Sequence, residues 1–271
     1  MLQQAGILAS NQPSGTLDLS EDEAFILVKA APRRSNTLGE TVCCAGLDRA
    51  GHWVRLYPVS FRQLEDAQRF ARWDRIRYRW GRPKASKDTR SESRRVDPNS
   101  VEIVGAVRAA ERHGLVNRCA VTSLKREHEA GRSLALLRAE VLEFWAEPRD
   151  ADQLREREAV LNLLRAQDDM FAPKTLIPMR SCPYEFKYRY RDDDGIHVGT
   201  CQDWETEQTF FARLRDQRSE RAALEWMIAK FGNEYPQKGM AFAMGTHRYR
   251  ATQWLINGVI RVNEERQPNL L

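Results

Sequence analysis

Residues 73–80, WDRIRYRW, alternate between cationic or acidic side chains and aromatic or aliphatic ones. A period of two separates side chains onto two faces only when the backbone is an extended strand. The two faces then consist of Arg75, Arg77 and Arg79 on one side and of Ile76, Tyr78 and Trp80 on the other. The pattern therefore predicts a β-strand with one buried face and one basic face, which requires a sheet that buries the apolar side.

This strand belongs to a longer cationic segment. Residues 72–95 hold ten Lys or Arg and three Asp or Glu, so the segment carries +7 in a chain whose net charge is +5. A field this concentrated favours a polyanionic partner, and we predict that the partner is nucleic acid. Residues 82–95 are rich in Lys, Arg and Ser and are expected to form a loop that becomes ordered on its partner.

The three arginines of residues 73–80 need a counter-anion, because like charges on one face repel. Alternate residues of a strand lie about 6.6 Å apart, close to the separation of phosphates in an extended single strand. Acidic residues on a neighbouring strand would neutralise the arginines equally well. The sequence leaves both explanations open.

The surrounding region, residues 24–110, is predicted to be a β-rich basic domain. The expected elements are strands at 24–31, 40–48, 52–59 and 96–107 and a short helix at 61–70. A turn at 48–51 makes 40–59 a β-hairpin. Short strands, one short helix and a basic loop favour a small barrel-like fold of the OB-like or PUA-like kind.

The strand expected at 52–59 carries Trp53, Arg55 and Tyr57 on one face. Aromatic rings that flank a guanidinium can stack bases and hold a phosphate. Alternatively, the two rings cover the edge of a core and Arg55 extends past them to water.

The remainder of the chain completes an α+β fold. Residues 1–23 are expected to be a flexible leader, and 111–172 a helical connector with helices at 119–145 and 151–168. Residues 173–271 are predicted to form a C-terminal ββαββ region, with strands at 183–194, 196–205, 239–247 and 252–262 around a helix at 206–231.

The first strand of the C-terminal region repeats the basic alternation. Lys187, Arg189 and Arg191 share one face there, and aromatic residues share the other. Lys187 and Arg189 are therefore further candidates for contact with nucleic acid. A continuous basic track across both halves of the chain would follow if the two strands lie side by side.

Asp203-Trp204-Glu205 places two carboxylates at a strand end, just before a helix. Such a pair suits a divalent metal or acid-base chemistry. With His197 the pair would form a metal site for Mg²⁺ or Mn²⁺, and with His247 it would form a catalytic group, if these side chains converge. The same carboxylates could instead stabilise the positive end of the helix.

Other enzymatic patterns are weaker. Glu185-Phe186-Lys187 matches the ExK half of a nuclease pattern, with Asp168 or Asp169 upstream as the other carboxylate. The chain contains no GxSxG, no GxxxxGK[ST] and no GxGxxG segment, which disfavours a serine hydrolase, a P-loop NTPase and a dinucleotide-binding enzyme.

Five cysteines without CxxC spacing disfavour a zinc site and are typical of a reducing compartment, so we expect a cytoplasmic protein. No apolar run reaches the roughly 18 residues of a membrane span, and the N-terminus lacks signal-peptide features. We therefore expect no membrane partner.

Residues 39–64 (GETVCCAGLDRAGHWVRLYPVSFRQL), 87–97 (KDTRSESRRVD), 203–205 (DWE) and 245–260 (GTHRYRATQWLINGVI) together resemble an uncharacterised bacterial protein family. In that family WxRLYPxxFR is followed by DxRxES. The family has no established activity, so the resemblance implies no mechanism. It implies that one feature contains Arg55, Arg62, Asp88, Arg90 and Glu92, and that Asp203 and Glu205 belong together. The relatives carry a Cys/His turn before DWE, where this chain has a single His and a displaced Cys201.

The sequence thus predicts a nucleic-acid-binding protein with a basic strand-and-loop platform, and a bacterial defence or mobile-element system is the setting we expect for it. The candidate contacts are Trp53, Arg55, Tyr57, Arg62, Arg75, Arg77, Arg79, Lys84, Lys87, Arg90, Arg94, Arg95, Lys187 and Arg189. Two alternatives remain open. One is a metal-dependent nuclease or phosphodiesterase with an Asp-x-Glu site, and the other is an interaction subunit of a larger bacterial complex with a protein partner.

Overall fold

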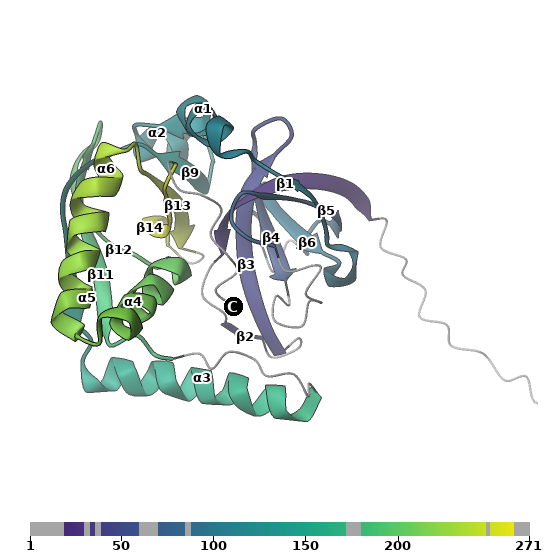
Figure 1. Ribbon diagram of the computed structural model, residues 1–271. Helices are drawn as coiled ribbons and strands as arrows, with labels where there is room; N and C mark the ends of the chain where they lie inside the picture. Colours follow the sequence, from purple (N-terminus) through teal and green to yellow (C-terminus); the bar gives the residue numbers. More distant parts are fainter. Residues whose placement is uncertain are drawn as a thin grey trace, which may run out of the picture.

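The structure is a computed structural model that describes residues 19–29, 33–35, 39–59, 70–84, 88–171, 180–247 and 250–262. The chain forms two lobes, a β-barrel and a mixed α+β lobe, which lie side by side (Figure 1). Within the described ranges, no helix is both long and apolar enough to cross a membrane.

The barrel lobe contains the first seven strands. They are β1 (Ser20–Lys29), β2 (Arg33–Ser35), β3 (Gly39–Asp48), β4 (Trp53–Val59), β5 (Asp74–Gly81), β6 (Ser93–Val96) and β7 (Glu102–Ala106), with a 3₁₀ turn, η3 (Pro98–Ser100), before β7. Five of the strands close into a ring, β1-β3-β4-β6-β5 and back to β1. The predicted barrel is therefore confirmed.

The order of the strands around the ring identifies the kind of barrel. Numbered along the chain, the five ring strands pair as 1-2-3-5-4-1. The β4–β6 pair is parallel and the other ring pairs are antiparallel. This is the strand order of the five-stranded Greek-key barrel called the OB fold.

The alternation at residues 73–80 places the apolar side chains of β5 in the core, as predicted. Ile76 and Tyr78 of β5 are fully buried inside the barrel, together with Ile26, Val54 and Leu56. The predicted β3–β4 hairpin also forms, with Gly51 at φ 85° in its turn. These apolar faces of the ring strands point inward. The sheet buries them by curling until its first and last strands pair, which closes the barrel.

The C-terminal lobe contains two sheets and a helical layer. Its strands are β8 (Ala120–Val121), β9 (Leu134–Leu137), β10 (Glu140–Pro148), β11 (Tyr184–Asp192), β12 (Gly195–Thr200), β13 (Ala241–His247) and β14 (Arg250–Ile260), paired as β10-β11-β12 and β14-β13-β9-β8. Its helices are α2 (Leu124–Glu129), α4 (Trp204–Gln217), α5 (Glu220–Met227), η4 (Ile228–Glu234) and α6 (Tyr235–Gln237). The expected ββαββ order is present at β11–β14.

The prediction that residues 119–145 form a helix is wrong over much of its length. Helix α1 (Ala109–Cys119) ends where that helix was expected to begin, and β9 and β10 occupy 134–148. All four residues of β9 are buried, because its sheet is covered on both faces, so β9 shows no alternation. A bulge between Val141 and Glu143 interrupts the alternation of β10. Both strands therefore lack the period of two.

The helix predicted at 206–231 is divided into two. Arg218 ends α4 in the left-handed region, at φ 53°. Ser219 then caps α5, since its hydroxyl accepts a hydrogen bond from Ala222 N. The helical layer is therefore a pair, α4 and α5, which covers the aromatic core that contains Phe186 and Phe210 (Figure 1).

Three further differences concern boundaries. β1 begins at Ser20, inside the segment expected to be a leader, and β6 forms within the segment expected to be a loop. The rest of that leader, residues 1–18, and most of the helix expected at 61–70 lie outside the described residues.

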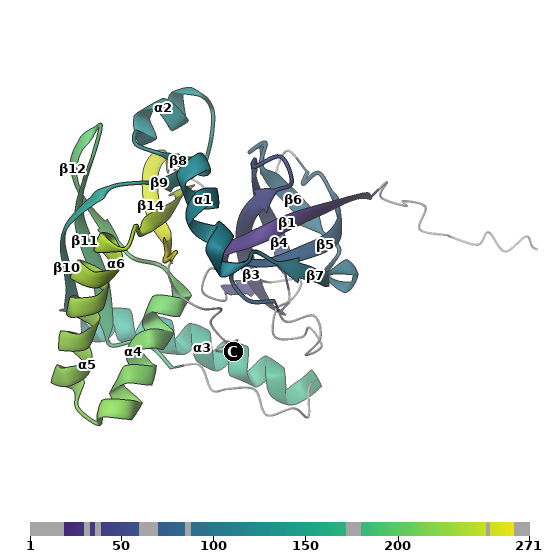
Figure 2. The same ribbon diagram turned by 45° about the horizontal axis from the view of Figure 1, so that its top comes forward.

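An apolar interface joins the lobes. Leu27, Val28 and Leu47 on the outside of the barrel pack against Leu136 and Ile260 of the C-terminal lobe. The approach is close at Gly258, where an added Cβ would lie 3.1 Å from Val28 Cγ2. Helix α1 bridges the lobes on one side, and α3 (Ala151–Phe171) runs beneath both on another (Figure 2).

Candidate nucleic-acid interface

The three arginines on the outer face of β5, here called the β5 stripe (Arg75, Arg77 and Arg79), face acidic residues on β1 and just after β6. Arg77 Nη2 lies 3.2 Å from Glu23 Oε1 on β1. Arg75 Nε lies 3.6 Å from the other oxygen of Glu23. Arg79 Nη2 donates to Asp97 Oδ2 at 2.7 Å. Acidic neighbours, the second explanation that the sequence left open, therefore neutralise much of the stripe.

The basic face of β11 is neutralised in the same way. β10 pairs antiparallel with β11 and brings acidic residues opposite its cations. Lys187 pairs with Glu147, Arg189 with Glu143, and Arg191 with Glu140. Cross-strand pairs of this kind stabilise a sheet modestly. The two basic strands lie in different sheets of different lobes. They therefore do not form one continuous sheet surface.

On a second basic surface of the barrel, the strand that pairs with the cation-bearing strand is β4, which places a tyrosine and not an acidic residue beside it. Tyr57 on β4 is directly beside Arg95 on β6, and both side chains are exposed, Tyr57 to 42%. Arg82 and Lys84 follow β5 and are exposed as well. Within the described part of the chain, no acidic side chain pairs with Arg82, Lys84 or Arg95. We call these four residues the Tyr57–Arg95 patch.

Arg94, next to the patch, lies on the other side of β6 from Arg95. Its guanidinium carbon lies 4.0 Å above the centre of the Trp80 ring, and its Nη1 donates to Ser91 O at 2.7 Å. This cation–π contact holds the end of β6 against the end of β5. Arg94 is therefore engaged within the barrel, whereas Arg95 points to solvent.

Trp53 and Arg55 of β4 face the C-terminal lobe. Arg55 Nη2 donates to Ser133 O at 3.3 Å and to Ser133 Oγ at 3.2 Å. Burial lowers the pKa of Arg55 to about 10, and the nearby guanidinium of Arg90 acts in the same direction. Trp53 packs against the apolar interface between the lobes. Tyr57 is thus the member of the predicted aromatic-arginine-aromatic stripe that is exposed to solvent.

The DxRxES segment has an internal structural role. Asp88 accepts two hydrogen bonds of 2.8 Å from the guanidinium of Arg90 and one of 2.7 Å from Ser93. Partial burial raises the pKa of Asp88, but the hydrogen bonds from Arg90 and Ser93 outweigh it and hold that pKa well below its usual range. Glu92 accepts a hydrogen bond of 2.7 Å from Ser133 N. Glu92 therefore helps to fix the connection between the lobes, while Arg90 pairs with Asp88 inside its own segment.

Asp203 and Glu205 are buried at the same boundary between the lobes, with 2% and 6% of each residue exposed. Arg72, which precedes β5, donates to both oxygens of Asp203 at 3.2 Å and lies 3.0 Å from Glu205 Oε2. Asp203 also accepts a hydrogen bond from Val259 N at 3.0 Å and caps α4. Lys29 of β1 lies 3.9 Å from Glu205 Oε1.

The charges of this cluster balance one another. Burial alone would raise the pKa of Glu205, but the cations of Arg72, Lys29 and Arg261 outweigh it and hold that pKa below its ordinary value. Glu205 is therefore ionised, and both carboxylates pair with cations from the barrel. Removal of one member would leave a buried charge uncompensated, which is costly.

The histidines do not complete a metal site with these carboxylates. His197 Nε2 lies 2.9 Å from Asp192 Oδ1, and its ring packs on Tyr190. His247 is the last residue of β13. Across the described ranges, no group of three His, Cys, Asp or Glu side chains is arranged to hold a metal ion.

The two charged residues of the ExK segment, Glu185 and Lys187, both form ion pairs with neighbouring residues. Glu185 pairs with Arg149 at 2.7 Å, and Lys187 pairs with Glu147. The side chains of Asp168 and Asp169 lie outside the described residues, as do two of the predicted nucleic-acid contacts, Arg62 and Lys87.

Two protein-family models match this chain. Residues 116–270 match the family described as a domain of unknown function, DUF8757. The chain belongs to this family. Residues 20–119 match a second domain of unknown function, DUF8758, so the predicted membership of an uncharacterised family is confirmed. A search of curated proteins finds no match.

The two family regions meet within α1, and each supplies one side of the connection between the lobes. The DUF8757 region contributes Asp203, Glu205 and Ser133, while the other region contributes Arg72 and Glu92. Sequence reasoning missed Arg72, although it is the cation that pairs with both carboxylates. A buried arginine that is 131 residues from its partner leaves no local pattern.

Proposed function

We propose that this protein binds single-stranded nucleic acid at the Tyr57–Arg95 patch. The observation that carries the proposal is an exposed tyrosine on a barrel with OB strand order, beside cations that no acidic side chain of the described residues pairs with. OB folds bind oligonucleotides on the face of their second and third strands and on the connections between strands 1 and 2 and strands 4 and 5. In this chain β4 is the third strand, and residues 82–92 form the connection between strands 4 and 5.

The chemistry of the patch fits a single strand better than a duplex. Every base has a flat face, so an exposed aromatic ring such as Tyr57 can stack on it without sequence preference. In a duplex these faces are covered by neighbouring base pairs. Arg82, Lys84 and Arg95 then supply charge for the phosphates on either side of the stacked base.

The C-terminal lobe limits the length of the binding surface. The C-terminal lobe contacts Trp53 and Arg55, in the first half of β4, and covers that part of the strand. A ligand therefore reaches β4 at Tyr57, in its second half. A short site of a few nucleotides is therefore expected, at the small end of the range of about 4–16 nucleotides found for OB folds.

The test is a fluorescence anisotropy titration with labelled DNA and RNA of about 16 nucleotides. Three neutralised phosphates on a single strand predict that log Kobs falls with log salt concentration with a slope of about −2. A matched duplex should bind more weakly. The proposal is refuted if neither single-stranded DNA nor single-stranded RNA binds, or if the affinity does not change with salt concentration.

The nuclease alternative has less support. A metal-dependent nuclease needs carboxylates that can reach an ion and a phosphate in water. Asp203 and Glu205 are instead buried and paired with Arg72 and Lys29. The pair is better explained as a connection between the lobes than as a metal site.

A further inference from the structure

β12 (Gly195–Thr200) lies at one edge of the sheet β10-β11-β12, away from the Tyr57–Arg95 patch. Within the described ranges it forms a ladder with β11 alone, and it bonds to β14 only beyond its end, through the bridge between Cys201 and Ile256. Ile196 is 59% exposed and Val198 62%, the highest values among the large apolar side chains that the structure describes. Because alternate residues of a strand share a face, the two form one apolar strip along this edge.

The backbone of β12 has groups that point away from β11. Cys201 N donates to Phe186 O at 2.8 Å, in continuation of the ladder between β11 and β12. The residues of an antiparallel pair alternate between those that bond to the neighbouring strand and those whose amide and carbonyl groups point away from it. Ile196, Val198 and Thr200 therefore present their amide and carbonyl groups outward. The edge offers a further strand both hydrogen bonds and an apolar strip.

Other edge strands of the described sheets carry features that keep a further strand away. β8 has only two residues, and the β5–β7 and β13–β14 pairs contain bulges. β12 pairs with β11 without a register shift, and its six residues include no proline and no Asp, Glu, Lys or Arg. This edge therefore lacks the usual protection against strand addition.

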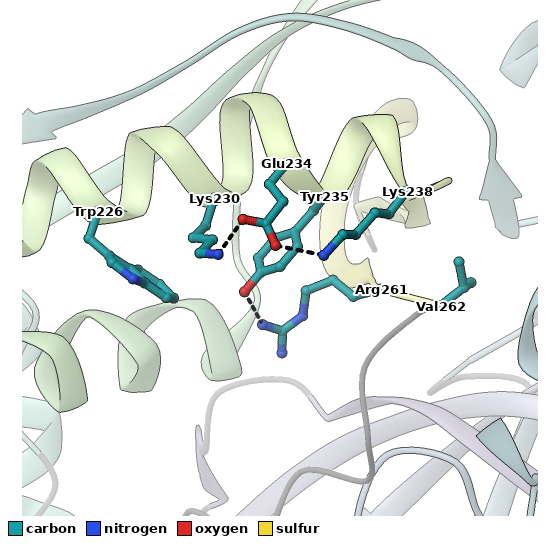
Figure 3. Close-up of a pocket in the computed structure, with 7 residues that line it drawn as sticks. All are labelled: Trp226, Lys230, Glu234, Tyr235, Lys238, Arg261 and Val262. Atoms are coloured by element: carbon teal, nitrogen blue, oxygen red, sulfur yellow. Dashed lines mark hydrogen bonds and ion pairs between the residues drawn. The ribbon is translucent and has the colours of Figure 1, made fainter.

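β10, at the other edge of the same sheet, is packed against a helical segment. η4 approaches β10 closely, since an added Cβ at Gly232 would lie 3.8 Å from Phe144 N. Ion pairs from Glu234 to Lys230 and Lys238 stabilise this helical segment (Figure 3). The two edges of the sheet thus differ, because a helix packs on β10 whereas the apolar strip of β12 faces solvent.

The charges next to β12 are balanced. Arg189 and Arg191 of β11 lie opposite Val198 and Ile196 in the ladder. Each of the two arginines pairs with a glutamate of β10. A second copy of this chain that approaches β12 therefore meets aliphatic side chains and paired charges, and no like charges oppose it.

We propose that β12 pairs antiparallel with β12 of a second copy, so that two three-stranded sheets join into one sheet of six strands. A two-fold pair sets a strand against itself, which favours a strand without charged side chains. If the pair is centred on His197, Ile196 lies opposite Val198 of the second copy. Each such pair exchanges two hydrogen bonds and places two β-branched side chains side by side.

The size of this contact sets the strength that we expect of the dimer. Stable interfaces between proteins bury about 1,200–2,000 Å² in total. Two strands of six residues cover less than this. Monomer and dimer should therefore exist in an equilibrium that shifts with protein concentration.

Sedimentation velocity of the full chain without nucleic acid tests the proposal. Over a roughly hundredfold range of concentration, the mean mass should rise from that of the monomer toward twice that value. Val198→Lys places a charge at the centre of the pair in both copies and should raise the dimer Kd about tenfold or more. Val198→Pro removes an outward N–H that β11 does not use and should have a similar effect. Circular dichroism verifies the fold, and Val198→Lys decides if the proline variant is unfolded.

Leu142→Lys is the matched control. Leu142 is 37% exposed on β10 of the same sheet, two strands away from β12. This variant also exchanges an exposed aliphatic side chain for a lysine, and it should dimerise like the wild type. The proposal is overturned if the chain is monomeric at every concentration, which would leave the edge to a peptide of another protein. It is also overturned if either Val198 variant, once shown to be folded, dimerises as tightly as the wild type, or if Leu142→Lys weakens the dimer as much as Val198→Lys does.

Discussion

The β5 stripe and the Tyr57–Arg95 patch lie on the same barrel and are both rich in arginine or lysine, but they differ in their neighbours. β5 pairs with β1, whose Glu21 and Glu23 lie opposite Arg79 and Arg77. β6 pairs with β4 at the patch, where Tyr57 lies opposite Arg95. The comparison teaches that the adjacent strand, and not the density of cations in the sequence, decides which surface is available to a polyanion.

The buried charges at the boundary of the lobes extend the same contrast, because there too each cation has an internal partner. Arg72, Asp203 and Glu205 connect the lobes, and so do Arg55 and Glu92 through Ser133. Most described residues of the resemblance motifs WxRLYP, DxRxES and DWE are buried or paired. Tyr57 is the exception, since its ring is exposed to solvent.

The largest effect is expected when a paired carboxylate is removed. Asp203→Ala leaves Arg72 buried without its main partner and removes the cap of α4, so the free energy of unfolding should fall by about 3–5 kcal/mol. Asp203→Asn, which can still cap the helix, should cost less. Urea unfolding followed by circular dichroism measures both. Unchanged stability of Asp203→Ala would show that the cluster does not hold the lobes together.

A smaller effect is expected on binding when the patch loses its ring. Tyr57→Ala should weaken the binding of single strands by about 1–3 kcal/mol, a factor of about 5 to 140 in Kd, because one stacked base is lost. Tyr57→Phe keeps the ring and should bind like the wild type. Anisotropy titrations at one salt concentration compare the three proteins. Equal affinity of Tyr57→Ala and wild type would exclude stacking on this residue.

The difference between the two surfaces should become smaller when an acidic partner of the β5 stripe is removed. Glu23→Gln removes the carboxylate that contacts Arg49, Arg75 and Arg77. One or two arginines should then become available to phosphates, and the salt slope should become more negative by about 0.7–1.4. Glu102→Gln, which removes a more exposed partner of Arg77, should have a smaller effect. A slope that does not change in Glu23→Gln would mean that the stripe is not masked by its neighbours.

The smallest effect is a pH dependence of stability. Hydrogen bonds from Arg49 and Arg77 hold the pKa of Glu23 below its ordinary value. The stabilisation by Glu23 is therefore complete above its pKa in the unfolded chain, about 4.3, and is lost as the pH falls through the lower pKa of the folded state. Thermal unfolding from neutral to acid pH should show a smaller loss of stability in Glu23→Gln than in wild type below about pH 4.3. Parallel curves would contradict this.

Part of this architecture could be predicted from the sequence because it depends on local alternation. The strand predicted at 73–80 is present as β5 at Asp74–Gly81, with Ile76 and Tyr78 in the core, and the hairpin of β3 and β4 has its turn where it was expected. The helical prediction for 134–145 failed because β9 is buried on both faces and β10 is bulged. Such strands resemble the apolar stripe of a helix when only the sequence is considered.

Which candidate residues are paired and which are exposed could not be predicted, because pairing and exposure depend on contacts between distant segments. The partner of Arg77 is Glu23, 54 residues away, and the partner of Arg72 is Asp203, 131 residues away. Register and lobe packing create these pairs, and neither leaves a mark within a window of neighbouring residues. Tyr57 could be recognised as a candidate from its strand, but its exposure depends on where the C-terminal lobe ends.

The measurement that tests the central claim most directly compares two triple variants with the same loss of charge. Arg82→Gln/Lys84→Gln/Arg95→Gln removes three cations of the patch, and Arg75→Gln/Arg77→Gln/Arg79→Gln removes the three of the stripe. The salt dependence of single-strand binding is then measured for both by anisotropy. The account predicts that the patch variant loses nearly all of the slope of about −2, whereas the stripe variant keeps most of it. A stripe variant that loses as much slope as the patch variant, or more, would contradict the account.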